Sequence, residues 1–234
     1  MYITPSDAIS LVERDRAKVN KRFEMLRAAA QELIAMDIPE EEYLKLKPIQ
    51  NNRELRRTTF HYNLMSETTG GKWVESCMDC MKMLKAFKTG RRKPSEETVK
   101  SVTDTFISHF CYTSDMLPSE TLEYLDADKA DTNQKLDELK YVCQVMKRYG
   151  VTDSDYGKAY AQYTFHDDYV LNAVGIAFSK PLAEAHDLAH YVEDSDFKPY
   201  KSWWDKLFRG GKMDPTLRAT LNRILELYVR ITNK

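Results

Sequence analysis

Two stretches of the chain, one near each end, carry apolar residues at alternating spacings of three and four. Because an α-helix turns once every 3.6 residues, this spacing predicts two helices, each with one buried stripe. The stripes are Ile9, Val12, Arg16, Val19, Phe23, Leu26, Ala30 and Leu33, and then Leu217, Leu221, Ile224, Tyr228 and Ile231. Arg16 interrupts the first stripe. Two interpretations stay open: packing within a helical bundle, or pairing with a second copy in a register that Arg16 sets.

Shorter apolar stripes, separated by caps and breaks, predict further helices. They cover residues 53–65, 72–88, 131–149, 153–165 and 181–191, and one more helix begins at a Ser95 cap. The acidic stretch from Tyr112 to Asp131 is expected to be loop-like, with one short helix around residues 120–125. No convincing strand pattern is found, so the fold is predicted to be all-α with about eight to ten helices.

The breaks divide the sequence into three segments. Residues 1–50 hold the long N-terminal helix and a short second helix. Residues 51–115 form a central helix-turn-helix-like unit, and residues 116–234 form a helical C-terminal region. No internal repeat is found.

Composition points to a soluble protein of the cytoplasm. The 234 residues are 42% hydrophobic, and no stretch approaches the roughly 18 apolar residues that a membrane helix needs. The first residues show no secretory leader. The cysteines are Cys77, Cys80, Cys111 and Cys143. The first two have C-x-x-C spacing without a second close pair, so buried free thiols are favoured over a zinc site.

The net charge of -1 conceals opposite charges along the chain. Residues 1–100 hold 19 Lys+Arg and 15 Asp+Glu, or +4; residues 101–200 hold 8 and 18, or -10; residues 201–234 hold 8 and 3, or +5. The densest basic segment lies between Met81 and Lys93 and contains no acid. Its cations are Lys82, Lys85, Lys88, Arg91, Arg92 and Lys93. They are candidate contacts to nucleic-acid phosphates.

The same segment carries a family resemblance. Residues 84–102, LKAFKTGRRKPSEETVKSV, resemble the second half of a Cro/XRE-type helix-turn-helix domain. In that family a recognition helix ends at a glycine, a basic turn follows, and a capped helix begins after a proline. The resemblance places these features at Gly90, Arg91 to Lys93, and Pro94 with Ser95. It implies that Leu84 and Phe87 lie inside the unit. The groove-facing and phosphate-facing positions would be Cys80, Met81, Lys82, Lys85 and Lys88, with Arg91, Arg92 and Lys93 near the phosphate backbone.

The sequence leaves open both the structure around Met78-Asp79 and the function of the protein. Where the family turns between its two helices, this chain has Met78-Asp79, and one helix or two are both consistent with residues 72–88. The resemblance implies a regulator that binds double-stranded DNA, and a homodimer is expected because one such unit buries too little surface for specific binding. The alternative is a non-enzymatic inhibitor or adaptor that docks on a protein partner through its acidic 101–200 region.

A metal-dependent helical enzyme is the third hypothesis. His186 and His190 are four residues apart, so both can face one metal ion, with Glu193 further along the same face. His166 or Asp167 would complete the site if the preceding segment folds back. Phosphate-binding, dinucleotide-binding and hydrolase motifs are absent from the sequence. An enzyme is therefore the less expected class, and no cofactor other than this metal ion is predicted.

Overall fold

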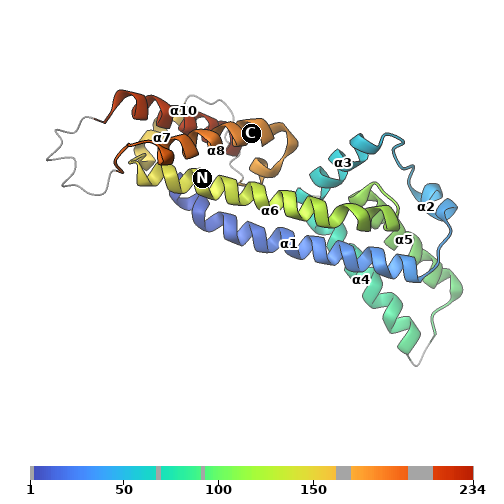
Figure 1. Cartoon of the computed structure of the whole chain (residues 1–234). Helices are drawn as coiled ribbons and strands as arrows, with labels where there is room; N and C mark the ends of the chain where they lie inside the picture. The colour runs from blue at the N-terminus through green and yellow to red at the C-terminus, as the bar shows by residue number, and fades with distance from the viewer. Residues whose placement is uncertain (1–2, 67–69, 91–92, 162–169, 200–212, 234) are drawn as a thin grey trace. The chain divides into compact units, whose positions relative to one another are not determined.

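The computed structural model describes residues 3–66, 70–90, 93–161, 170–199 and 213–233. These residues are mostly helical, and none of their elements is a strand (Figure 1). The elements are α1 (Pro5–Ala35), α2 (Glu40–Leu46), α3 (Arg53–Met65), α4 (Gly70–Thr89), α5 (Glu96–Ser114), α6 (Pro118–Arg148), α7 (Asp153–Tyr160), η1 (Val170–Val174), η2 (Ile176–Phe178), α8 (Ser179–Asp194) and α10 (Pro215–Thr232). The all-α class is confirmed, and the α-helices of the described residues fall within the predicted number.

The chain forms two compact units. One comprises residues 1–16 together with 131–234, and the other comprises residues 17–130. The division therefore passes through α1 and α6, and not along the sequence boundaries near residues 50 and 115 that the pattern suggested.

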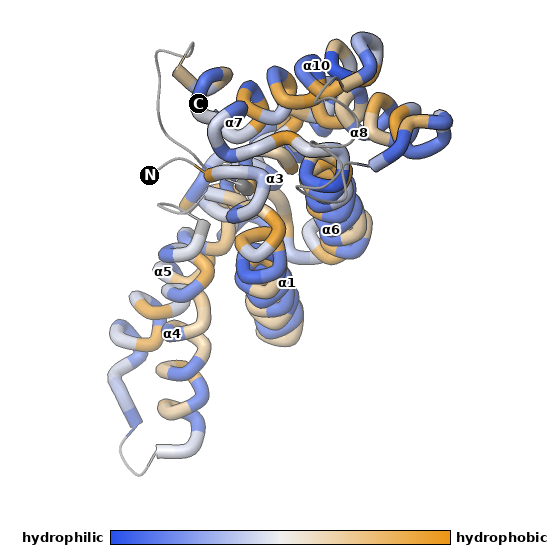
Figure 2. The backbone as a smooth tube through the Cα atoms, turned by 90° about the vertical axis from the view of Figure 1, so that its left-hand side faces the viewer, coloured by the Kyte–Doolittle hydropathy of each residue, from blue (hydrophilic) through white to orange (hydrophobic). Residues whose placement is uncertain are grey.

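In the first unit, the core is built around α10. Asp214 caps this helix, because its Oδ1 accepts hydrogen bonds from the backbone N–H groups of Thr216 (2.8 Å) and Leu217 (3.1 Å). All five members of the predicted stripe are buried. Figure 2 shows hydrophobic bands recurring along α10 between hydrophilic ones. The hydroxyl of Tyr228 also donates to the carbonyl oxygen of Ile3 (2.9 Å), which fixes the start of the chain against this helix.

The second unit comprises the remainder of α1, the helices from α2 to α5 and the beginning of α6. Phe23, Leu26 and Leu33 of α1 are buried, as the first stripe predicts. From the other helices, Phe60 and Phe106 are among the largest fully buried side chains. The first stripe is thus covered inside the chain, which favours the bundle interpretation over a seam between two copies.

The acidic stretch between Tyr112 and Asp131 is helical, so the predicted loop is wrong. α5 ends at Ser114, the next residue, Asp115, has a left-handed φ of 54°, and α6 begins at Pro118. Proline suits a first helical position, because the N–H group that it lacks has no partner there. The carboxylates that made the stretch look loop-like pair with cations of helices elsewhere in the sequence, such as Glu120 with Arg56 at 2.7 Å.

The α1–α6 ion pairs show one arrangement twice, eleven residues apart. In each case a glutamate of α1 pairs with a lysine of α6. The arginine three residues later on α1 then pairs with the aspartate three residues earlier on α6. The pairs are Glu13–Lys140 (2.6 Å) and Arg16–Asp137 (2.5 Å) in the first unit, and Glu24–Lys129 (2.5 Å) and Arg27–Asp126 in the second. Eleven residues make slightly more than three helical turns, so the repeated pairs lie on nearly the same face of each helix.

Candidate nucleic-acid interface

The basic segment of the sequence lies where α4 and α5 meet as a helical hairpin (Figure 1). α4 continues without a turn through Met78 and Asp79, so residues 72–88 form one helix. After it, Ser95 caps α5 by accepting a hydrogen bond from the backbone N–H of Thr98 (3.2 Å). The predicted cap is confirmed, whereas the turn that separates two helices in the Cro/XRE pattern is not present at Met78-Asp79.

The inner face of α4 is buried. Leu84 is buried and Phe87 half-buried, as expected for residues facing the inside of the hairpin. Cys80 and Met81 are buried as well, so their predicted positions on a groove-facing surface are wrong. The physical reason is that an unbroken α4 keeps its helical period, which aligns Cys80 with Cys77, Leu84 and the other core positions.

The outer face of α4 near its end is cationic and exposed. The side chains of Lys82, Lys85 and Lys88 are 76%, 61% and 69% exposed. Lys82 pairs with Asp79 one turn earlier (3.0 Å), and the other two lie 3.7 and 3.8 Å from Glu32. Exposed pairs of this kind are worth little in water, so these ammonium groups stay available to another anion.

The remaining predicted phosphate contacts follow α4. Lys93 is exposed. Arg91 and Arg92 lie outside the described residues. We refer to Lys82, Lys85, Lys88 and Lys93 as the basic end of the hairpin.

Several carboxylates of the acidic 101–200 region pair with a basic side chain of the unit to which they belong. In the second unit Asp115 binds Lys47 at 2.5 Å, and both side chains are largely buried. Asp128 accepts from the buried ring of His61 at 2.9 Å. In the first unit, Glu193 pairs with Arg148, and Glu184 with Arg223 at 2.7 Å. Some of these acids, such as Asp115 and Glu120, therefore lie in mostly buried ion pairs, whereas Lys82, Lys85 and Lys88 are mainly exposed to water.

The proposed metal ligands enter aromatic and ionic contacts. The rings of His186 and His190 lie 4.6 Å apart on α8, and Tyr141 of α6 packs against both. The Tyr141 hydroxyl is 3.2 Å from Nδ1 of His190 and 3.3 Å from Glu193, which also binds Arg148. His166 and Asp167 lie outside the described residues. Within the described part of the chain, no three His, Cys, Asp or Glu side chains are grouped to hold a metal ion.

The surroundings of Tyr141 agree with a structural role, in which its ring packs against His186 and His190. Burial, with the nearby charge of Glu193, raises the pKa of Tyr141 to about 12. Its hydroxyl therefore stays protonated as a hydrogen-bond donor at neutral pH.

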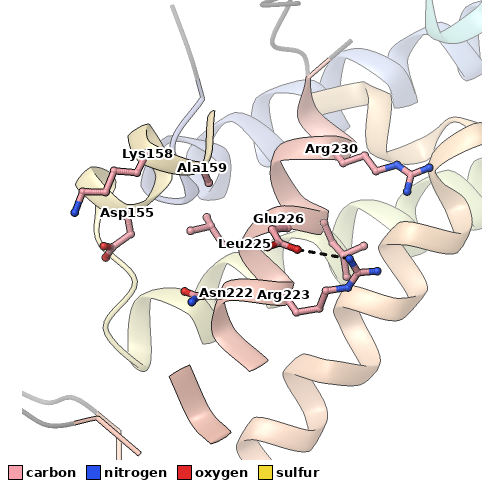
Figure 3. Close-up of a pocket in the computed structure, with 9 residues that line it drawn as sticks. Asp155, Lys158, Ala159, Asn222, Arg223, Leu225, Glu226 and Arg230 are labelled. Carbon is pink, nitrogen blue, oxygen red and sulfur yellow. Dashed lines mark ion pairs between the residues drawn. The ribbon is translucent and has the colours of Figure 1, made fainter. Parts of the chain in front are cut away.

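A groove of about 520 Å³ lies between α7 and α10 in the first unit (Figure 3). Its charged groups do not converge: Figure 3 shows Lys158 and Arg230 pointing away from each other. Arg223 pairs with Glu226 (3.6 Å), and the carboxylate of Asp155 caps α7. A ligand site needs a few polar groups aimed at one point, so this groove is a weaker candidate than the hairpin.

All four cysteines are buried free thiols. Burial raises the pKa of Cys77, and it raises that of Cys111 to about 12. A zinc ligand must be a thiolate, so these raised values agree with the predicted structural role.

Comparison with known proteins gave no matching family model, no similar curated protein and no similar solved structure. None of the helices in the described residues combines the length and apolar character that crossing a membrane requires.

Proposed function

We propose that the protein binds double-stranded DNA through the basic end of the α4–α5 hairpin and acts as a regulator. The observation that carries this proposal is a contrast in how far the charged side chains are exposed to water. Carboxylates of the acidic region meet internal cations such as Lys47 and Arg56, whereas Lys82, Lys85 and Lys88 are mainly exposed to water. Exposed cations spaced along one helix end suit a phosphate backbone.

The proposed contact differs from the Cro/XRE arrangement in one respect. Because α4 is continuous, the end of a single long helix, together with the segment that follows it, would meet the duplex. An α-helix fits the major groove, and lysines on its outer face can reach the phosphates along the groove walls. One hairpin offers a small contact area, so a homodimer belongs to the proposal.

A cytoplasmic location is also proposed. Its support is the state of the cysteines, all four of which are buried thiols without a disulfide. Free thiols suit a reducing compartment.

The decisive experiment measures duplex binding as a function of salt. A fluorescein-labelled 24-base-pair duplex would be titrated with the full chain, with fluorescence anisotropy read at several salt concentrations. The variant Lys82→Gln/Lys85→Gln/Lys88→Gln should bind at least about tenfold more weakly at low salt. Its slope of log K against log salt should be shallower by about 0.9 for each phosphate that the removed ammonium groups neutralise in the wild type.

The matched control lies at the other end of the same helix. Lys72 is exposed on the first turn of α4, and Lys72→Gln should leave affinity and slope unchanged. Duplex binding that is absent at low salt, or equal in the triple variant and the wild type, would exclude the proposal.

The acidic 101–200 region gives less support to the protein-docking alternative. Asp115 and Glu120 pair with Lys47 and Arg56 through side chains that are mostly buried, so a partner protein would have to break those ion pairs to reach them. Within the described second unit, carboxylates without such partners gather elsewhere, around α2 and the start of α5.

A further inference from the structure

An open groove of about 390 Å³ lies in the second unit, between α5 and the segment that leads into α2. Its floor is apolar. The apolar lining residues are Ile38, Pro94, Val99 and Ile107. Ile107 is buried, and the other three are half-buried, so part of this apolar surface faces solvent.

The rim of the groove is acidic. Glu42, Glu96 and Asp104 line it, and Lys100 is its single cation among the described lining residues. Lys100 pairs with Asp104 at 2.8 Å, and Glu42 pairs with Lys45 at 2.5 Å. Of these three carboxylates, only Glu96 has no cationic partner among the described residues.

Further carboxylates surround the groove. Glu40 and Glu41 precede Glu42 in the first turn of α2, and Glu97 follows Glu96 in the first turn of α5. Glu40, Glu41, Glu96 and Glu97 have no cationic partner among the described residues, unlike Glu120 and Asp126 of α6, which pair with arginines. An apolar floor thus lies between carboxylates that are free to bind cations.

We propose that this groove binds a basic amphipathic helix of a partner protein. The apolar face of such a helix would cover Val99 and Ile38, and its flanking lysines or arginines would meet the acidic rim. Along α5 the lining residues run from Glu96 to Ile107, so this side of the groove extends about 16 Å at 1.5 Å per residue. That length accommodates roughly three turns of helix. A nucleic acid is disfavoured here because its phosphates would face like charge.

The probe for this site is a synthetic fluorescein-labelled 14-residue peptide made of leucine and lysine, with leucine at helical spacing. Its control has glutamate in place of every lysine. The lysine peptide should bind the full chain with saturable anisotropy, and the glutamate peptide should not. Val99→Asp, which places a charge on the floor, should weaken binding by about tenfold. Glu96→Lys should weaken it several-fold.

Two control variants away from the groove distinguish binding in the groove from a general attraction between the basic peptide and the protein surface. Leu55 is an exposed apolar residue of α3, and Glu75 an exposed acid of α4. Leu55→Asp and Glu75→Lys should bind the lysine peptide as the wild type does. Equal weakening by these controls, or unchanged binding by Val99→Asp, would overturn the proposal.

Two further measurements keep the test decisive. Methyl NMR of the wild type should show peptide-induced shifts at Ile38, Val99 and Ile107; shifts confined to other methyl groups would overturn the assignment. Sedimentation equilibrium addresses the other occupant, because a dimer that Val99→Asp dissociates would assign the groove to a second copy instead. Val99→Asp should retain full duplex binding, so this test fails or succeeds independently of the proposed function.

Discussion

The guanidinium of Arg22 donates a hydrogen bond from Nη1 to the backbone carbonyl oxygen of Leu64, 3.1 Å away. The same nitrogen lies 3.2 Å from the carbonyl oxygen of Met65. Both acceptors belong to the last turn of α3, where carbonyl groups lack partners within the helix. A buried arginine of α1 therefore caps the C-terminal end of α3.

Replacing Arg22 with methionine should destabilise the protein by about 2–3 kcal/mol, because the α3 carbonyl groups lose a charged donor while they stay buried. The measurement is urea unfolding followed by circular dichroism. Lys21, its exposed neighbour, provides the control, and Lys21→Met should stay within about 0.5 kcal/mol of the wild type. An equal effect of both substitutions would contradict the capping role.

Gly71 lies against the same arginine. A Cβ added there would come within 3.1 Å of Nη2 of Arg22, a tight contact with a side chain that its hydrogen bonds hold in place. Gly71→Ala should therefore destabilise the wild type by about 1 kcal/mol despite the better helix propensity of alanine. In an Arg22→Ala background the same change should become neutral or stabilising. Additive effects in this double-mutant cycle would contradict the proposed contact.

Acid should weaken the α1–α6 ion pairs. The hydrogen bond from Lys140 lowers the pKa of Glu13 below its ordinary value of 4.5, and Lys129 does the same for Glu24. A carboxylate with a lowered folded-state pKa contributes stability that is complete above the ordinary value. That stability is lost as pH falls through the folded-state pKa. The wild type should thus lose stability from about pH 4.5 downward.

The variant Glu13→Gln/Glu24→Gln isolates this contribution. Its urea midpoint should decline less than that of the wild type between pH 6 and pH 3. Glu75→Gln, at an exposed position on α4, should leave the wild-type decline unchanged. Identical pH profiles for the double variant and the wild type would show that these pairs do not respond to acid.

The cysteines should resist modification in the folded protein. Burial raises the pKa of Cys80 and Cys143 as well as those of Cys77 and Cys111. Because the thiolate is the reactive form, the folded chain should react slowly with a disulfide reagent at pH 8, and all four thiols should react after unfolding in guanidinium. Rapid reaction of Cys77 and Cys80 in the folded state would contradict their burial.

Local features of the fold were predictable because their causes are local. In the stripe that ends at Leu33 every apolar member except the half-buried Ile9 is buried, and in the stripe that begins at Leu217 all members are buried, as their period requires. The caps at Ser95 and Asp214 follow from hydroxyl and carboxylate groups at positions where helix N–H groups need acceptors.

Ion pairs between residues far apart in the sequence explain why the helix α6 was wrongly predicted to be a loop. α6 begins at Pro118 within an acidic stretch, where side chains such as Asp126 pair with Arg27, about one hundred residues earlier in the sequence. The helical period of one segment carries no information about such partners. The error at Met81 has a different cause. The continuity of α4 places this residue on the buried face of the helix, and a local family resemblance could not show it.

The repeated α1–α6 ion pairs also bear on how the helices align while the chain folds. A slip of one turn in one direction would place Arg16 opposite Lys140, and a slip in the other direction would place Glu13 opposite Asp137. The second unit has the same property through Arg27 and Lys129, or Glu24 and Asp126. Either misalignment brings like charges together, which is unfavourable. The positive and negative side chains of α1 and α6 nearly cancel in the net charge, but their order along each helix selects the register in which the two helices align.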